Sequence, residues 1–141
     1  MNKLSVFASL LISVLVPQVR AQSGCFNFNL QGDYSFVASG TIVNAPGLPA
    51  GPFAAAGKTT YDGDGNASGV IEISLAGTIV LSTWHGTYKM DPATCTATKA
   101  LTLDVNGATL HFFITAGANF TELRFVATDT GTAISGTAKK Q

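Results

Sequence analysis

Hydrophobic and polar residues alternate along most of the chain after residue 32, which is the pattern of strands with one buried face. Eight such segments follow one another: 33–43, 53–61, 67–75, 78–90, 96–105, 108–115, 120–128 and 132–139. Most are separated by short glycine-containing turns, and Asn106-Gly107 is the strongest hairpin signal among them. The pattern predicts an all-β protein, an antiparallel up-and-down eight-stranded β-barrel; an open β-sandwich is the alternative.

The segment 78–95 is the one around which the others are organised. It contains the longest predicted strand and the only tryptophan, Trp84, and it ends in Asp91-Pro92 and Cys95. Trp84 and Tyr88 share one face of the strand, whereas His85 lies on the other. Neither face is purely apolar, as expected for a strand in a small closed sheet.

Two segments lie outside the predicted strands. Residues 44–52 contain three of the five prolines and form the longest connection, a candidate cover for one end. Residues 23–32 form a lead-in that we expect to be anchored through Cys25, Phe26 and Phe28.

Residues 1–21 have the pattern of an export signal. A short basic start at Lys3 precedes the apolar run 4–16, and small residues precede a cleavage site after Ala21. The run is shorter than the about 20 residues that span a bilayer; an N-terminal membrane anchor is the alternative. The sequence predicts a secreted or periplasmic protein whose residues 22–141 form a single domain, with no membrane span after signal removal.

The low and nearly balanced charge of the chain argues against nucleic acid as a partner. Only 11% of the residues are charged, against about 25% in a typical soluble domain. Loss of residues 1–21 leaves six basic and eight acidic residues and no basic patch. The chain is therefore not expected to bind nucleic acid. We expect no cofactor.

Cys25 and Cys95 are the only cysteines. In an exported chain, two cysteines most simply form one structural disulfide. It would tie the lead-in to the turn that follows the Trp84 strand. A metal or redox role would need further ligands or a C-x-x-C motif, and the sequence has none.

Four groups of residues resemble, in this order, small exported bacterial proteins of unknown function. They are Leu30-Gln31-Gly32-Asp33-Tyr34-Ser35-Phe36, Tyr61-Asp62-Gly63-Asp64-Gly65-Asn66, Gly86-Thr87-Tyr88 with Asp91 and Cys95, and Thr128-Asp129-Thr130-Gly131-Thr132 with Ser135-Gly136. The same motifs resemble, more loosely, the allene oxide cyclase barrel-like group. Members of this group have a calycin-like β-barrel, and dirigent proteins share that barrel. The resemblance implies a barrel. It carries over no catalytic residue set, and the disulfide and export signal depart from the intracellular cyclases of the group.

One turn has the start of a calcium-loop pattern. Asp62, Asp64 and Asn66 have the first three ligand spacings, but an EF-hand needs glycine and glutamate where Ala67 and Ile73 stand. A surface turn is the simpler interpretation, and no metal site is predicted.

Four polar residues within strands are candidate ligand contacts. His85 and His111 are the only histidines and would act as acid or base if both faced one cavity. Glu122 and Arg124 share one strand face, either as surface charges or as a pair inside the barrel that anchors a ligand. Surface or structural roles are the simpler interpretation for all four.

These patterns leave three functions open. The first is binding of a small apolar or amphipathic ligand in the barrel, with Trp84, Tyr88, His85, His111, Glu122 and Arg124 as candidate contacts. The second, which the resemblance suggests, is a cyclase or isomerase of the allene oxide cyclase type, in which the barrel lumen would fold a reactive polyene. The third is a structural or carbohydrate-contacting surface protein with a filled barrel, in which exposed Trp84 and Tyr88 stack on sugar rings.

Overall fold

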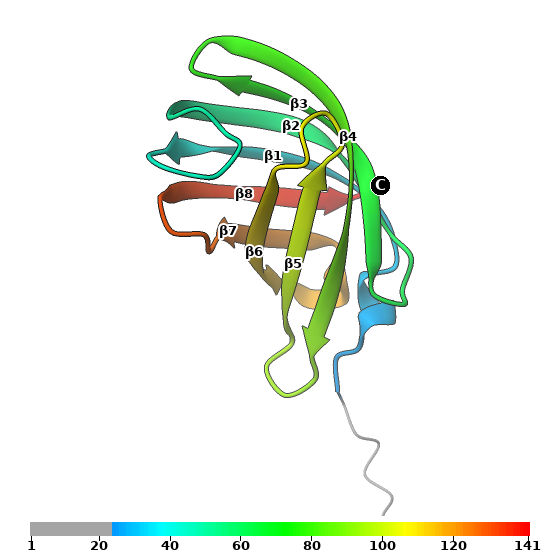
Figure 1. Cartoon of the computed structure of the whole chain (residues 1–141). Coiled ribbons are helices and arrows are strands. Elements are labelled where there is room, and N and C mark those ends of the chain that lie inside the picture. The colour runs from blue at the N-terminus through cyan, green and yellow to red at the C-terminus, as the bar shows by residue number, and fades with distance from the viewer. Residues whose placement is uncertain (1–23) are drawn as a thin grey trace, which may run out of the picture.

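The computed structural model describes residues 24–141, which form a closed antiparallel barrel of eight strands (Figure 1). The export-signal prediction for residues 1–21 lies outside the described residues. Two short 3₁₀ turns, η1 (Asn27–Leu30) and η2 (Ala118–Phe120), accompany the strands. The strands are β1 (Gly32–Ile42), β2 (Gly51–Tyr61), β3 (Asn66–Leu75), β4 (Thr78–Asp91), β5 (Thr96–Leu103), β6 (Thr109–Ala116), β7 (Glu122–Ala127) and β8 (Thr132–Lys140).

Pairing of the first and last strands closes the barrel. β1 pairs with β8 from Tyr34 opposite Lys140 to Ile42 opposite Thr132. Every other strand pairs with its neighbours in sequence, so the topology is up-and-down. The predicted eight-stranded barrel is confirmed, and the open sandwich is not the fold.

Strand β4 joins the two halves of the barrel. Its residues from Thr78 to Thr87 pair with β3, and those from Trp84 to Asp91 pair with β5. Figure 1 shows the strand curving from the β3 side to the β5 side. Its inward positions include the buried Trp84 and Tyr88, which are 1% and 4% exposed.

The largest interior side chain requires a glycine opposite it. Trp84 pairs with Gly69 of β3, and a Cβ atom at Gly69 would lie 2.9 Å from the Trp84 indole nitrogen. It would also overlap the carbonyl oxygen of Lys58 in β2. Strand β3 can therefore pass close to both neighbours only without a side chain at this position.

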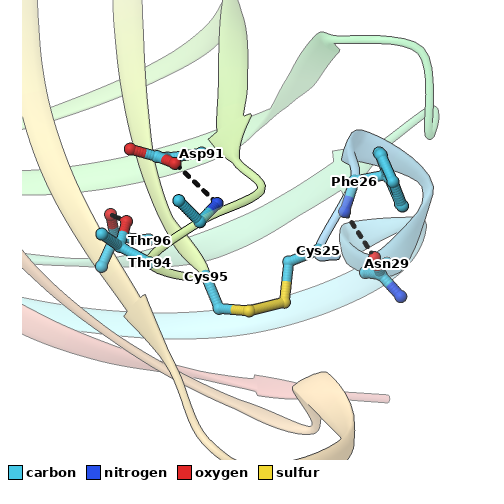
Figure 2. The surroundings of a disulfide bond; sticks show 8 residues. Cys25, Phe26, Asn29, Asp91, Thr94, Cys95 and Thr96 are labelled. Carbon is cyan, nitrogen blue, oxygen red and sulfur yellow. Dashed lines mark hydrogen bonds between the residues drawn. A yellow bond between two sulfur atoms is a disulfide. The ribbon is translucent and has the colours of Figure 1, made fainter. Parts of the chain in front are cut away.

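One end of the barrel is closed by the lead-in and the disulfide. Leu30 of η1 is fully buried, and the Asn27 side-chain oxygen accepts a hydrogen bond of 2.8 Å from the Met90 backbone N–H. Cys25 is bonded to Cys95, with Cα atoms 5.1 Å apart, which confirms the predicted disulfide (Figure 2).

The expectation that Phe26 and Phe28 anchor the lead-in is wrong. These side chains are 45% and 61% exposed and stack on each other with ring centroids 5.7 Å apart. Leu30 and Cys25 hold the segment instead, because residues in a tight 3₁₀ turn cannot all face the barrel at once.

The opposite end is covered by the connection between β1 and β2. Ala45 belongs to the buried core, and Leu48 packs against it. The Asn106 side-chain N–H donates to the Gly47 carbonyl oxygen at 3.1 Å, which ties the loop to the turn after β5. The proline-rich connection is therefore a fixed cover at this end.

Within residues 24–141, no helix is long and apolar enough to cross a membrane.

Replacing both Cys25 and Cys95 by alanine should destabilise the barrel strongly. The bridge closes a loop between residues 70 apart in sequence, so chain entropy alone gives it roughly 4 kcal/mol. For a domain of this size that is a fall of roughly 10–20 °C in Tm, measured by circular dichroism. Two free thiols in the native protein, or an unchanged Tm in the double variant, would refute the structural role.

Candidate functional site

The barrel interior contains a small, mostly apolar cavity. Its volume is about 40 Å³, enough for about three water molecules. Every strand except β4 contributes to its wall, and most of the contributed side chains are aliphatic or aromatic. The three polar residues that line it are Thr59, Tyr61 and Lys99.

Lys99 places a cationic group inside the barrel. It lies on β5 in the inward phase of Ala97, Leu101 and Leu103, and only 9% of it is exposed. Its Nζ atom lies 4.1 Å from the centroid of the Trp84 ring and 5.3 Å from that of Tyr61. The faces of these two rings carry negative potential, so they partly replace the water that an ammonium group loses on burial.

No acidic side chain balances this amine. The cavity wall contains no aspartate, glutamate or histidine. Among the ion pairs formed by residues 24–141, none involves Lys99. Burial without a counter-ion lowers the pKa of Lys99 to about 7. Near neutral pH the interior therefore holds a mixture of ammonium and free amine.

Three tyrosines fix the aromatic surroundings of the amine. Tyr61 packs edge-to-face between Tyr34 and Tyr88, with ring centroids 5.4 Å and 4.9 Å apart. Burial, followed by its two tyrosine neighbours, raises the pKa of Tyr61 far above its usual range. The Tyr61 ring facing Lys99 is thus held in place and neutral.

The two outer tyrosines, Tyr34 and Tyr88, form hydrogen bonds to the backbone. The Tyr34 hydroxyl donates to the Phe120 carbonyl oxygen at 2.6 Å. The Tyr88 hydroxyl donates to the Asn27 carbonyl oxygen at 3.1 Å and accepts from the Gly63 N–H at 2.9 Å. Trp84 differs: its buried indole N–H has no hydrogen-bond partner within residues 24–141.

The six sequence-predicted contact residues fall into two groups. Trp84 and Tyr88 point into the barrel, but neither lines the cavity. Trp84 instead packs beneath the Lys99 amine. Because both rings are buried, neither is available to stack on a sugar at the surface.

The two histidines face outward and do not meet. The His85 side chain is 69% exposed and its Nδ1 atom lies 2.6 Å from Asp104 Oδ1. His111 is 56% exposed and lies 2.7 Å from Asp129. Each histidine therefore belongs to its own surface pair with an aspartate at a strand end.

Glu122 and Arg124 also lie outside the barrel. Their side chains are 45% and 78% exposed, and the closest approach of Glu122 Oε1 to Arg124 Nε is 3.9 Å. Leu123 and Phe125, on the opposite face of β7, are the residues that line the cavity. The sequence alternation put the two pairs on opposite faces, and the structure shows that the charged face is the outer one.

Lys99 is the functional candidate that the sequence interpretation missed. The signal was present, because Ala97, Leu101 and Leu103 are apolar at two-residue intervals on either side of it. A charged residue at an inward position means either that the strand is irregular there or that the charge is buried. Sequence alone favours an irregular strand, because lysine is rarely buried.

The Asp62 turn is held by its own hydrogen bonds. Asp62 Oδ1 accepts from the backbone N–H groups of Asp64 and Asn66 at 2.7 Å and 2.9 Å, and Oδ2 accepts from the Asn66 amide at 2.7 Å. These bonds lower the pKa of Asp62. Within the described part of the chain, no group of three or more His, Cys, Asp or Glu residues could hold a metal ion.

A comparison with protein-family models and with curated proteins finds no match to this chain. The resemblance to the allene oxide cyclase barrel-like group therefore stays a prediction.

The stability of the barrel should rise with pH because of Lys99. Its pKa falls from 10.5 to about 7 on folding, so the unfolded chain binds more protons between these two values. The free energy of unfolding should therefore increase by about 2 kcal/mol from pH 7 to pH 9 and be nearly constant from pH 5 to pH 6. Denaturant titrations at a series of pH values measure this slope.

The matched variants for this test are Lys99→Met, which removes the amine, and Lys89→Met, which removes an exposed lysine of β4. Lys99→Met should be more stable than wild type at pH 7 and should lose the slope, whereas Lys89→Met should keep it. Parallel pH profiles for wild type and Lys99→Met would show that the amine is not buried as described.

Proposed function

We propose that this protein is an exported β-barrel that binds a small, largely apolar molecule in its interior. Export is supported by the signal pattern in residues 1–21 and by the disulfide, since such bonds persist in oxidising compartments. A secreted or periplasmic location follows from the same two features.

The cavity carries the proposal. It combines an apolar wall with one amine that has no acidic partner in that wall. Ligand sites commonly combine apolar surface with a few polar groups that fix the ligand orientation. A filled barrel that acted only through its surface would have no need of a buried amine, which destabilises the fold.

The size of the cavity limits the ligand. At about 40 Å³ it is much smaller than the roughly 300–1,000 Å³ of sites for drug-sized molecules. It fits a molecule of roughly three or four non-hydrogen atoms. This favours a small ligand over a polyene, and so favours binding over a cyclase or isomerase.

Binding can be tested with three-carbon probes. Propan-1-ol and propan-2-ol should shift the methyl signals of Ile73 and Ile114, which line the cavity, in NMR titrations of the mature protein. With at most about 1.5 kcal/mol per non-hydrogen atom, the Kd should lie above roughly 10 µM. Native mass spectrometry of protein purified from its own host tests for a resident ligand in parallel.

Two alanines on the same strand give a matched pair of variants. Ala55 lines the cavity, and Ala56 faces solvent. Ala55→Leu should fill the cavity and abolish the methyl shifts, whereas Ala56→Leu should retain them. Absence of cavity-specific shifts in wild type, or equal shifts in the two variants, would overturn the proposal.

A further inference from the structure

We propose that Lys99 captures small aliphatic aldehydes in the cavity by forming an imine with them. This inference rests on the proposed function, because the aldehyde must enter the same cavity. It names the ligand class and gives the buried amine a role in holding it.

The position of Lys99 brings its amine to the wall of the cavity. Lys99 lines the cavity, and Trp84 and Tyr61 flank its Nζ atom. No carboxylate in the cavity wall competes for the amine. The apolar wall also limits the water that would hydrolyse an imine.

The chemistry needs no further reagent. The Nζ lone pair attacks the carbonyl carbon, a C–N bond forms, and the carbonyl π electrons move to oxygen, which is protonated. The resulting carbinolamine loses water as the C=N bond forms, so one amine and one aldehyde give one imine and one water. Thr59 and Tyr61 are the hydroxyl-bearing residues of the same wall.

The protonation state of Lys99 suits this step. Its pKa of about 7 leaves about half of the amine neutral at pH 7, roughly a thousandfold more than for an ordinary lysine. A desolvated lysine in an apolar pocket is a known type of activated nucleophile. The other titratable groups buried nearby are Tyr34, Tyr61 and Tyr88, whose pKa values are all raised, so they stay neutral.

Covalent capture also answers the problem of ligand size. A molecule of about four non-hydrogen atoms has too little surface to bind tightly through contacts alone. A reversible C–N bond to Lys99 would hold such a molecule more tightly than the small cavity surface can.

Reductive trapping tests the proposal. The mature protein is incubated at pH 7 with propanal and sodium cyanoborohydride, which reduces an imine to a stable secondary amine. Peptide mapping should place a propyl group on Lys99, counted apart from any on the N-terminal α-amine, whose ordinary pKa of about 8 also leaves it partly neutral. We expect Lys99 to be modified at least about tenfold faster than each exposed lysine, Lys58, Lys89, Lys139 and Lys140.

The variants separate a cavity imine from surface chemistry. Lys99→Met should lose the fast modification and Lys89→Met should keep it. Ala55→Leu, which retains the amine but fills the cavity, should slow it, whereas Ala56→Leu should not. Without reductant, propanal should change the emission of Trp84, the only tryptophan, in wild type but not in Lys99→Met.

Equal labelling of all lysines, or fast labelling that Ala55→Leu leaves unchanged, would overturn the imine. If propan-1-ol and propan-2-ol shift the cavity methyl signals while propanal is not trapped on Lys99, the imine proposal fails and the binding proposal stands. If neither occurs, both fail.

Discussion

Closure of the sheet between β1 and β8 is the constraint from which the other features follow. A closed barrel leaves no free edge, but it fixes an interior that inward side chains must fill. The largest of these side chains, Trp84, fits only because a neighbouring strand provides space. Gly69 provides it for Trp84, and a side chain at that position would collide with both the indole and the neighbouring strand.

The same constraint explains why Lys99 stands out. Most polar groups at the ends of the interior have partners: the Tyr34 and Tyr88 hydroxyls bond to backbone carbonyls, and Ser82 donates to the Thr83 carbonyl oxygen. These bonds stabilise the closed ends. The Lys99 amine has aromatic faces instead of an anion, and the fold therefore tolerates an interior group that destabilises it near and below neutral pH.

Much of the fold could be predicted from the sequence because two-residue alternation is strong in every strand. The predicted strand 78–90 became Thr78–Asp91, and 67–75 became Asn66–Leu75. The predicted strand bounds are less accurate where a turn shortens a strand at one of its ends. Predicted strand 120–128 starts only at Glu122, because Asn119 and Phe120 have positive φ values of 60° and 55°. Predicted strand 96–105 stops at Leu103, because the Gly107 N–H donates to the Leu103 carbonyl oxygen at 2.8 Å and closes a turn there.

The candidate site was harder to predict because alternation gives the faces of a strand but not which face is inside. On β4 the sequence left both faces open, and the burial of Trp84 and Tyr88 shows that His85 faces outward. On β7 the sequence left it open, and the packing of Leu123 and Phe125 inside decides it.

The inward positions of β5 could be predicted from the sequence. Its lysine would nevertheless be assigned to the solvent-facing side, since an unpaired buried charge is rare. Whether such a charge can be buried depends on Trp84 and Tyr61. Trp84 lies on β4, which pairs with β5, and Tyr61 lies on β2, which is separated from β4 only by β3. The surroundings of the amine therefore come from three strands of the curved sheet and not from β5 alone. These surroundings are mostly apolar and include no acidic side chain, and burial in such surroundings lowers the pKa of a lysine.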